Sequence, residues 1–189
     1  QLYHGGELHK NAVDNGQFNG FLLYPQASVL QGAWNGEERK FVMELVEDFL
    51  IPEVHVDPFR ISVDGLSAGG LASWNSLKDF PKLVAACLPI SNASSTFNNI
   101  VISNKFTPIW LFQGALDTDP RPIASHNLKN LADNAGANFT YTEYPNLGHG
   151  AWYAAWGEPD YFPFLNRANK ANPWPFYGRT EFCNTGPGS

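Results

Sequence analysis

Short apolar runs rich in β-branched and aromatic residues alternate along the chain with longer segments whose apolar positions recur at helical spacing. The short runs are typical of buried strands, and the longer segments are typical of helices that bury one face. The predicted strands occupy residues 21–24, 61–65, 83–90, 108–112 and 139–144, and residues 1–3 resemble the end of another strand. The predicted helices occupy residues 37–50, 71–77 and 123–135, with partly helical structure over 151–168. Strands that alternate with helices predict an α/β fold with a mainly parallel sheet.

Turn-forming residues set the expected limits of several elements. Pro52 is expected to end the helix over 37–50, because proline cannot continue a helix. Gly136 is expected to end the helix that starts near residue 123. Residues 8–19 are polar and contain turn formers, so they are predicted to be a loop. The polar stretch that follows the predicted strand over 83–90 and runs through Asn99 is predicted to be a loop as well.

The composition is that of a globular domain. Hydrophobic residues make up 43% of the 189 residues and charged residues 16%, which excludes a largely disordered chain. The net charge of −6, without a basic stripe, argues against a nucleic-acid partner, and no apolar run is long enough to cross a bilayer. Residues 171–189 are rich in Pro, Gly, Asn and Thr, so we expect one domain over 1–170 and a tail or linker over 171–189.

One stretch carries a specific chemical signal. The strand-like run that begins at Ile61 ends in Gly-Leu-Ser-Ala-Gly and passes at once into a helix-compatible segment. This is the strand, sharp turn and helix of a nucleophile elbow, which holds a serine, here Ser67, at the tip of a strained turn. Bulky side chains in place of Gly65 and Gly69 are expected to clash there. The turn also puts the hydroxyl at a helix N-terminus, which favours developing negative charge.

A serine becomes a good nucleophile when a base removes its proton and an acid orients that base. Asp117, just past the predicted strand over 108–112, is the first candidate for the acid, and Asp119 is the alternative. His149 is the candidate for the base, because it directly follows a predicted strand and is flanked by glycines. The three residues occur in the order serine, acid, histidine, which is one of the orders known for this kind of triad. The sequence has no metal-ligand spacing, and the chemistry of a serine hydrolase implies neither a metal nor an organic cofactor.

A site for acyl transfer also needs N–H donors for the oxyanion. The N–H of Ala68, directly after the serine, is one candidate, and Gly6 or Gly5 in the glycine-rich loop near the N-terminus is the other. Trp34 and Trp152 are candidates to line a substrate pocket.

Six segments of the chain follow the pattern of a known protein group. They are Tyr24–Gln26, Val56–Ile61, Gly65–Gly70, Leu88–Ser91, Gln113–Asp117 and Gly148–Trp152. With them, residues 1 to 165 resemble α/β-hydrolase esterases of the polyhydroxybutyrate-depolymerase-like and feruloyl-esterase-like group, near the prolyl-oligopeptidase type of serine hydrolase. The resemblance implies a three-layer α/β-hydrolase sandwich, a triad of Ser67, Asp117 and His149, and an oxyanion loop at His4–Gly6.

The chain departs from that group at its beginning. Its oxyanion loop is one residue shorter than the group's usual loop, and the strands that normally precede the loop are absent. In the fold that the resemblance implies, the strand ending at Tyr3 lies between the strand over 21–24 and the elbow strand. Losing this strand would leave a gap in the middle of the sheet, with unpaired backbone groups on both sides. We therefore expect an upstream segment or a second chain to complete the sheet.

The tail suggests where the protein acts. Residues 177–183 are weakly similar to the start of a following module in secreted, multi-domain bacterial proteins. We therefore expect a secreted or extracellular protein.

The sequence as a whole predicts a serine esterase that uses an acyl-enzyme intermediate. The expected substrate is a small-molecule ester or an ester linked to a polysaccharide. Two alternatives stay open at this point: a serine peptidase of the prolyl-oligopeptidase type, and a non-catalytic binding module of a larger secreted protein.

Overall fold

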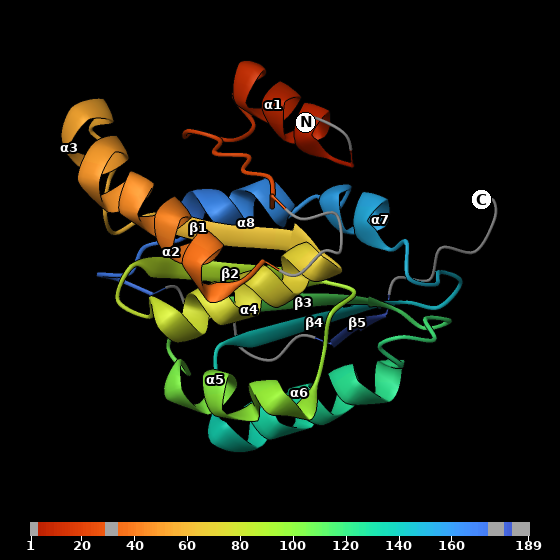
Figure 1. Cartoon of the computed structure of the whole chain (residues 1–189). Coiled ribbons are helices and arrows are strands. Elements are labelled where there is room, and N and C mark those ends of the chain that lie inside the picture. Colours follow the sequence, from red (N-terminus) through yellow and green to blue (C-terminus); the bar gives the residue numbers. More distant parts are fainter. Residues whose placement is uncertain (1–3, 29–33, 174–179, 183–189) are drawn as a thin grey trace.

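The computed structural model describes residues 4–28, 34–173 and 180–182, and it contains one parallel sheet with the strand order β1-β2-β3-β4-β5 (Figure 1). Its strands are β1 (Ile61–Leu66), β2 (Val84–Ile90), β3 (Ile109–Gly114), β4 (Phe139–Tyr144) and β5 (Thr180–Phe182). Every neighbouring pair is parallel, and the spatial order of the strands is their order along the chain. The predicted α/β fold with a mainly parallel sheet is confirmed.

Helices cover both faces of the sheet and give the molecule three layers (Figure 1). The helical elements are α1 (Gly6–Asp14), α2 (Gly36–Leu45), the π-helical turn η1 (Val46–Leu50), α3 (Ile51–Val54), α4 (Ala68–Asp79), the 3-10 turn η2 (Ser95–Phe97), α5 (Asn98–Ser103), α6 (Pro122–Ala135), α7 (Trp152–Trp156) and α8 (Tyr161–Arg167). Among the described residues, no helix is both long and apolar enough to span a membrane.

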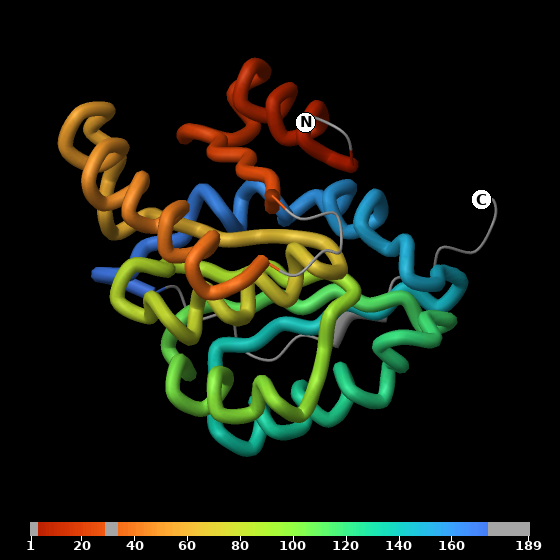
Figure 2. Tube along the Cα trace, viewed as in Figure 1, coloured from red at the N-terminus to blue at the C-terminus, as the bar shows by residue number. Residues whose placement is uncertain are grey.

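The core consists of two apolar clusters, one on each face of the sheet, because successive strand residues point to opposite faces. In β2, Cys87 packs with the cluster on the α4, α5 and α6 side, which includes Trp74. The next residue, Leu88, packs with the cluster on the α7 and α8 side, which includes Trp156. The α1 helix lies on this second side as well, as the chain trace in Figure 2 shows, and its residue Leu8 packs against the cluster.

The α1 helix corrects the prediction of a loop over residues 8–19. Acidic Glu7 lies in its first turn, where a negative charge suits the helix dipole. His9 and Ala12 are buried on one face of the helix. Packing of this face against the domain outweighs the polar composition of the segment, as is usual for short helices.

Pro52 does not end the helical segment that begins at α2. The chain makes the π-helical turn η1 and then continues as α3, where Pro52 lies in the first turn. In η1 the Ile51 N–H donates to the Val46 carbonyl five residues back, so the regular hydrogen-bond pattern of the α-helix is already broken where Pro52 enters. The segment ends instead at His55, which adopts a left-handed conformation with φ of 60°. The helix expected to end at Gly136 does end there, because this residue also takes a left-handed conformation, with φ of 63°.

The loop predicted from the end of β2 through Asn99 is only partly a loop. Residues 91–94 are irregular, whereas residues 95–97 form η2 and residues 98–99 begin α5. Ile100 and Val101 of α5 are buried in the first cluster, so the helix is held by a short apolar face.

The strand predicted over residues 21–24 is absent, and this segment runs as irregular chain with side chains that are 36% to 65% exposed. The residues expected to end a strand at Tyr3 lie outside the described part.

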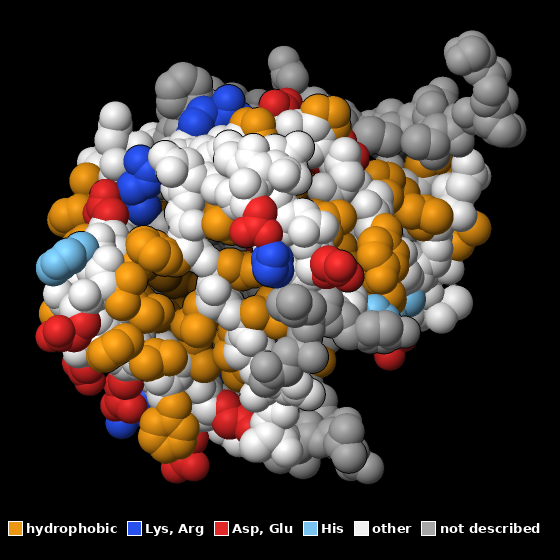
Figure 3. Space-filling model, turned by 90° about the horizontal axis from the view of Figure 1, so that it is seen from above, with side chains coloured by type: hydrophobic (Ala, Val, Ile, Leu, Met, Phe, Trp, Pro, Cys, Tyr) orange, Lys and Arg blue, Asp and Glu red, His pale blue; other side chains and the backbone are white. Residues whose placement is uncertain are grey.

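Within the described residues, β1 is an edge strand, paired on one side only. Large apolar side chains in the segments that precede β1 are exposed, among them Phe21 and, on α2, Phe41. Figure 3 shows hydrophobic side chains gathered toward the side on which α2 and α3 lie in Figure 1. That an upstream segment or a second chain covers this edge stays a prediction.

The predicted tail contributes to the sheet. Residues 180–182 form β5 and pair in parallel with Tyr141–Glu143 of β4. The division of the chain at residue 170 stays a prediction.

Replacing Leu88 tests how much the second cluster contributes to stability. Leu88 is fully buried, so Leu88→Ala should lower the free energy of unfolding by about 2–5 kcal/mol through lost burial and the cavity left behind. Leu116 is 64% exposed and is the matched control, since Leu116→Ala should change stability by less than about 0.5 kcal/mol. Urea unfolding of the two variants measures both values, and equal losses would contradict this account of the core.

Candidate active site

Ser67 lies at the sharp turn between β1 and α4, in a strained backbone conformation with φ of 51° and ψ of −112°. Two hydrogen bonds from neighbouring strand ends hold this conformation. The Ser67 N–H donates to the carbonyl of Ile90 at 2.8 Å, and Asn92 Nδ2 donates to the Ser67 carbonyl at 3.1 Å. The nucleophile candidate therefore sits directly before the first turn of α4, whose N–H groups have no partner within the helix.

The two glycines of the elbow differ in what they do. A Cβ at Gly65 would lie 2.5 Å from the backbone of Gly69, so only glycine fits where the strand passes under the helix. A Cβ at Gly69 would meet nothing within 4 Å. The expected clash at Gly69 is therefore wrong. The second close approach lies one residue later, because a Cβ at Gly70 would come 2.9 Å from Asn92 Cβ.

His149 lies between the serine and an aspartate. Its Nε2 is 2.8 Å from Ser67 Oγ, and its Nδ1 is 2.9 Å from Asp117 Oδ2. The loop that carries His149 is anchored by Ser91, whose hydroxyl donates to the His149 carbonyl at 2.7 Å. The histidine side chain is 41% exposed, so one side of the ring stays open to the solvent.

The carboxylate of Asp117 is almost completely buried, and each of its oxygens has a partner. Oδ2 accepts a hydrogen bond from Gln113 Nε2 at 2.7 Å as well as contacting His149. Oδ1 accepts the backbone N–H of Asp119 at 3.0 Å. Of the two aspartates considered from the sequence, Asp117 contacts the histidine, and Asp119 contributes its main chain to holding Asp117.

The loop with Gly5 and Gly6 leads into α1, where Gly6 is the first helical residue. Gly5 has φ of 99°, and a Cβ there would lie 2.4 Å from the ring of Trp156, so the loop packs directly on this indole. The ring of Trp152 links the loop to His149, because its centroid lies 5.8 Å from that of His4 and 6.1 Å from that of His149.

The two tryptophans proposed to line a pocket lie in different places. Trp152 bridges the loop and His149 with edge-on ring contacts, and it is half-buried. Trp34 precedes α2, and its carbonyl accepts a hydrogen bond from Arg39 at 2.6 Å. Among the contacts of the described residues, none joins Trp34 to Ser67 or His149.

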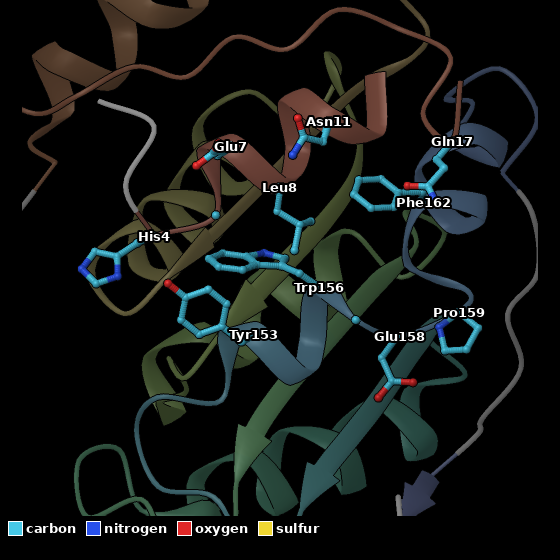
Figure 4. A pocket seen from close by; sticks show the side chains of 12 residues that line it. His4, Glu7, Leu8, Asn11, Gln17, Tyr153, Trp156, Glu158, Pro159 and Phe162 are labelled. Atoms are coloured by element: carbon cyan, nitrogen blue, oxygen red, sulfur yellow. The ribbon is translucent and has the colours of Figure 1, made fainter. Parts of the chain in front are cut away.

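A surface groove of about 760 Å³ begins at the glycine loop and runs between α1 and the α7–α8 region (Figure 4). His4 lies at one end of it and Pro159 toward the other, with Tyr153 and Trp156 between them. Ser67 and His149 do not line the groove. His4, which lines this groove, contacts the ring of Trp152, and Trp152 in turn contacts the ring of His149.

The side chains that support the three central residues carry no role predicted from the sequence. These are Gln113, Ser91 and Asn92, which bond to Asp117, to the His149 carbonyl and to the Ser67 carbonyl respectively. All three lie at the carboxyl end of a strand or just beyond it, where a parallel sheet collects its functional side chains. A polar residue at or just beyond the carboxyl end of a predicted strand is the sequence signal that could have pointed to these three side chains. No cluster of three or more potential metal ligands occurs among the described residues.

Comparison with known proteins gives structural neighbours only. No protein-family model and no curated protein sequence matches the chain. A thermostable esterase of solved structure is 26% identical with a TM-score of 0.61, and the match covers 68% of this chain and 36% of the esterase. An acylaminoacyl peptidase from Pyrococcus horikoshii is 16% identical with a TM-score of 0.59, covering 75% of this chain and 29% of the peptidase. A CIB-like hydrolase from Thermoplasma acidophilum is 17% identical with a TM-score of 0.52. The match covers 74% of this chain and 65% of the hydrolase.

These neighbours and the parallel sheet define the class: the chain has an α/β-hydrolase fold, and its described residues contain no strand before β1. Its structural neighbours include esterases, as the resemblance in sequence implied. The chain spans little more than a third of the length of the thermostable esterase.

The two elbow glycines offer a matched test of the turn. Gly65→Ala should lower the free energy of unfolding by about 1–3 kcal/mol or more, because its methyl group would overlap the backbone of Gly69. Gly69→Ala adds the same methyl group in open space within a helix, so stability should stay the same or rise by up to about 1 kcal/mol. Thermal unfolding of both variants measures the difference, and similar melting temperatures would refute this geometry of the elbow.

Proposed function

We propose that this chain is a serine hydrolase that cleaves carboxylic esters through an acyl-enzyme intermediate. The observation that carries the proposal is the hydrogen-bonded chain from Ser67 Oγ through both ring nitrogens of His149 to the buried Asp117. A serine in a strained turn, with a base at 2.8 Å and an oriented acid behind that base, is the arrangement required for nucleophilic catalysis.

In the proposed reaction, Ser67 Oγ forms a bond to the ester carbonyl carbon while His149 Nε2 takes the serine proton. Asp117 holds the ring and stabilises the imidazolium. The tetrahedral intermediate then breaks its bond to the alcohol oxygen, which receives the proton from His149. A water molecule, deprotonated by His149, attacks the acyl-enzyme in the second half of the reaction, and collapse of that intermediate returns the proton to Ser67 as the acid leaves.

The proposed oxyanion donors are the N–H of Ala68 and an N–H of the Gly5–Gly6 loop. Both Ala68 and Gly6 begin a helix, so their N–H groups have no partner within it. The ring of Trp152, against both the loop and His149, supports a place for the substrate between them. The neighbouring groove offers room for the larger side of a small-molecule ester or an ester linked to a polysaccharide, with Tyr153 exposed beside it.

Labelling with a fluorophosphonate probe tests the proposal without a guess about the substrate. We expect a covalent adduct on Ser67, found by peptide mapping, because the probe reacts with serines that a base has activated. Ser67→Ala should abolish the adduct. If folded protein carries no adduct on Ser67, the site is not an assembled serine hydrolase, and a non-catalytic binding module becomes the better description.

A panel of esters and peptides then separates the two kinds of enzyme. Ser67-dependent turnover of esters with negligible turnover of peptides is the expected result. Preferred cleavage of peptides would instead indicate a peptidase of the prolyl-oligopeptidase type. Secretion stays a prediction, as does completion of the sheet by a further segment or chain.

The aspartate pair provides an internal control for the proposed triad. Asp117→Asn should lower kcat on an ester by about 10⁴-fold, since the amide supports the wrong histidine tautomer. Asp119→Asn should lower it less than about tenfold, because the Asp119 contact to Asp117 comes from its main chain. Steady-state kinetics on both variants measures the ratio, and equal losses would remove Asp117 from the role proposed.

A further inference from the structure

Gln113 is a polar side chain enclosed between the candidate acid and helix α6. It is fully buried and lies on β3, all of whose residues are buried. Its Nε2 is 2.7 Å from Asp117 Oδ2, 3.3 Å from the Pro120 carbonyl oxygen and 3.5 Å from the Gly114 carbonyl oxygen. Its Oε1 is 3.3 Å from the hydroxyl of Ser125, which is fully buried on α6. The side chain therefore connects α6 to the carboxylate of the candidate acid.

The partners of Gln113 determine which end of its amide faces Asp117. An ionised carboxylate and a carbonyl oxygen can only accept hydrogen bonds, so the NH2 end of the amide has to face them. A hydroxyl can donate, and among the contacts of the described residues the Ser125 hydroxyl is the partner of Oε1. Turning the amide over would place Oε1 against three acceptors, one of them 2.7 Å away. The chemistry of the surrounding groups thus makes Gln113 a donor to Asp117.

This donor limits how the Asp117 carboxylate can turn. Oδ1 accepts the Asp119 N–H at 3.0 Å, but a single bond on one oxygen leaves the broad terminal torsion of an aspartate free. Oδ2 faces Gln113 Nε2 at 2.7 Å and His149 Nδ1 at 2.9 Å. The histidine is the group to be positioned, and its side chain is 41% exposed, so it cannot fix the carboxylate that orients it. Gln113 supplies a fixed point that is independent of the histidine.

Helix α6 holds Gln113 in turn. Ser125, Leu128 and Ala132 are spaced three and four residues apart and are buried on one face of this helix, which packs on β3 and β4. The Ser125 hydroxyl is therefore carried by a packed helix face. Its distance of 3.3 Å to Oε1 is long for a hydroxyl donor, so this bond is the weaker of the two that fix the amide.

We propose that Gln113, anchored by Ser125 on α6, is a positioning residue that holds the Asp117 carboxylate in the orientation that His149 requires. The catalytic consequence rests on the proposed function. In that reaction an imidazolium forms once in each half, and each time Asp117 has to keep Nε2 directed at the reacting oxygen. Among the contacts of the described residues, none joins Gln113 to Ser67 or His149, so its effect passes through Asp117.

Steady-state kinetics on the full 189-residue chain tests the two residues of this pair. Gln113→Met removes the donor and keeps a side chain of similar length, so kcat on an ester should fall by about 10–100-fold with KM within about twofold, since slight misplacement of a catalytic group costs that much. Ser125→Ala should lower kcat by only about three- to tenfold, because it removes the weaker bond and leaves the donor in place.

Thr142→Val is the matched control. Thr142 is fully buried on the neighbouring strand β4, and its hydroxyl accepts the Trp110 indole N–H at 2.9 Å within the cluster on the α7 and α8 side. Removing this hydroxyl should lower the urea midpoint as Gln113→Met does, because each change breaks one buried hydrogen bond. It should leave kcat within about twofold of the unmodified protein, since Thr142 has no link to Asp117.

Two further measurements separate positioning from mere support of the fold. In the Asp117→Asn background, Gln113→Met should lower kcat by less than about twofold, because the carboxylate through which it acts is already gone. Nuclear magnetic resonance on protein with labelled histidine follows the His149 Nδ1 proton that faces Asp117. Gln113→Met should speed the exchange of this proton with water and broaden its resonance, and Thr142→Val should leave it unchanged.

The outcomes distinguish the proposal from the function on which it rests. Unchanged kcat in Gln113→Met overturns the proposal, and so does a loss that is equally large in the Asp117→Asn background. If Gln113→Met does not fold, the His149 Nδ1 proton of Ser125→Ala decides, and unchanged exchange there overturns the anchoring. If the unmodified protein shows no Ser67-dependent ester hydrolysis, the proposed function fails together with the catalytic role of Gln113, while the resonance data still decide whether Gln113 orients His149 through Asp117.

Discussion

The parallel pairing of four consecutive strands is the constraint on which the candidate site depends. In a parallel sheet all carboxyl ends lie at one edge, and the chain leaves every strand on that edge. Ser67 directly follows β1, Asp117 lies in the loop after β3 and His149 in the loop after β4. Residues far apart in the sequence thus come within hydrogen-bonding distance without any long loop. Any antiparallel pairing among these strands would send part of the set to the opposite edge.

Strand β2, which lies between β1 and β3, carries none of these three residues but supports them. The chain that leaves β2 carries Ser91 and Asn92, which bond to the carbonyls of His149 and Ser67 and so tie the two outer loops to the middle of the sheet. Asp117 is supported in the same way by Gln113 at the end of β3. A buried carboxylate is tolerated only when its oxygens have partners, and these neighbours supply them. The site is therefore held by hydrogen bonds between strand ends and does not rely on the conformation of one loop.

Much of this arrangement could be predicted from the sequence, because it depends on local signals. The elbow follows from a β-branched run, two glycines and a helix, and the strand over 139–144 from its alternating pattern. The errors concern segments whose structure depends on distant contacts. Residues 21–24 are as apolar as a strand, yet no neighbouring strand pairs with them among the described residues. The α1 helix was missed because its polar sequence hides the short face that packs on the domain.

The contact between His9 and Asp64 could not be read from the sequence for a related reason. The loop at Gly5 belongs to no strand of the described sheet, so strand order says nothing about where it lies relative to Ser67. Its position must come from side chains, and two of them contact it: the Trp156 indole packs against Gly5, and His9 lies between the Gly5 carbonyl and Asp64 of β1. Packing against the indole limits how closely the loop can approach, but a non-directional contact cannot orient a peptide group. Hydrogen bonds are directional, and the Gly5 carbonyl both accepts the His9 backbone N–H at 2.9 Å and lies 2.8 Å from His9 Nδ1, so these contacts orient the peptide. Since Asp64 belongs to the same strand as the elbow, any movement of that strand carries the nucleophile and the loop together.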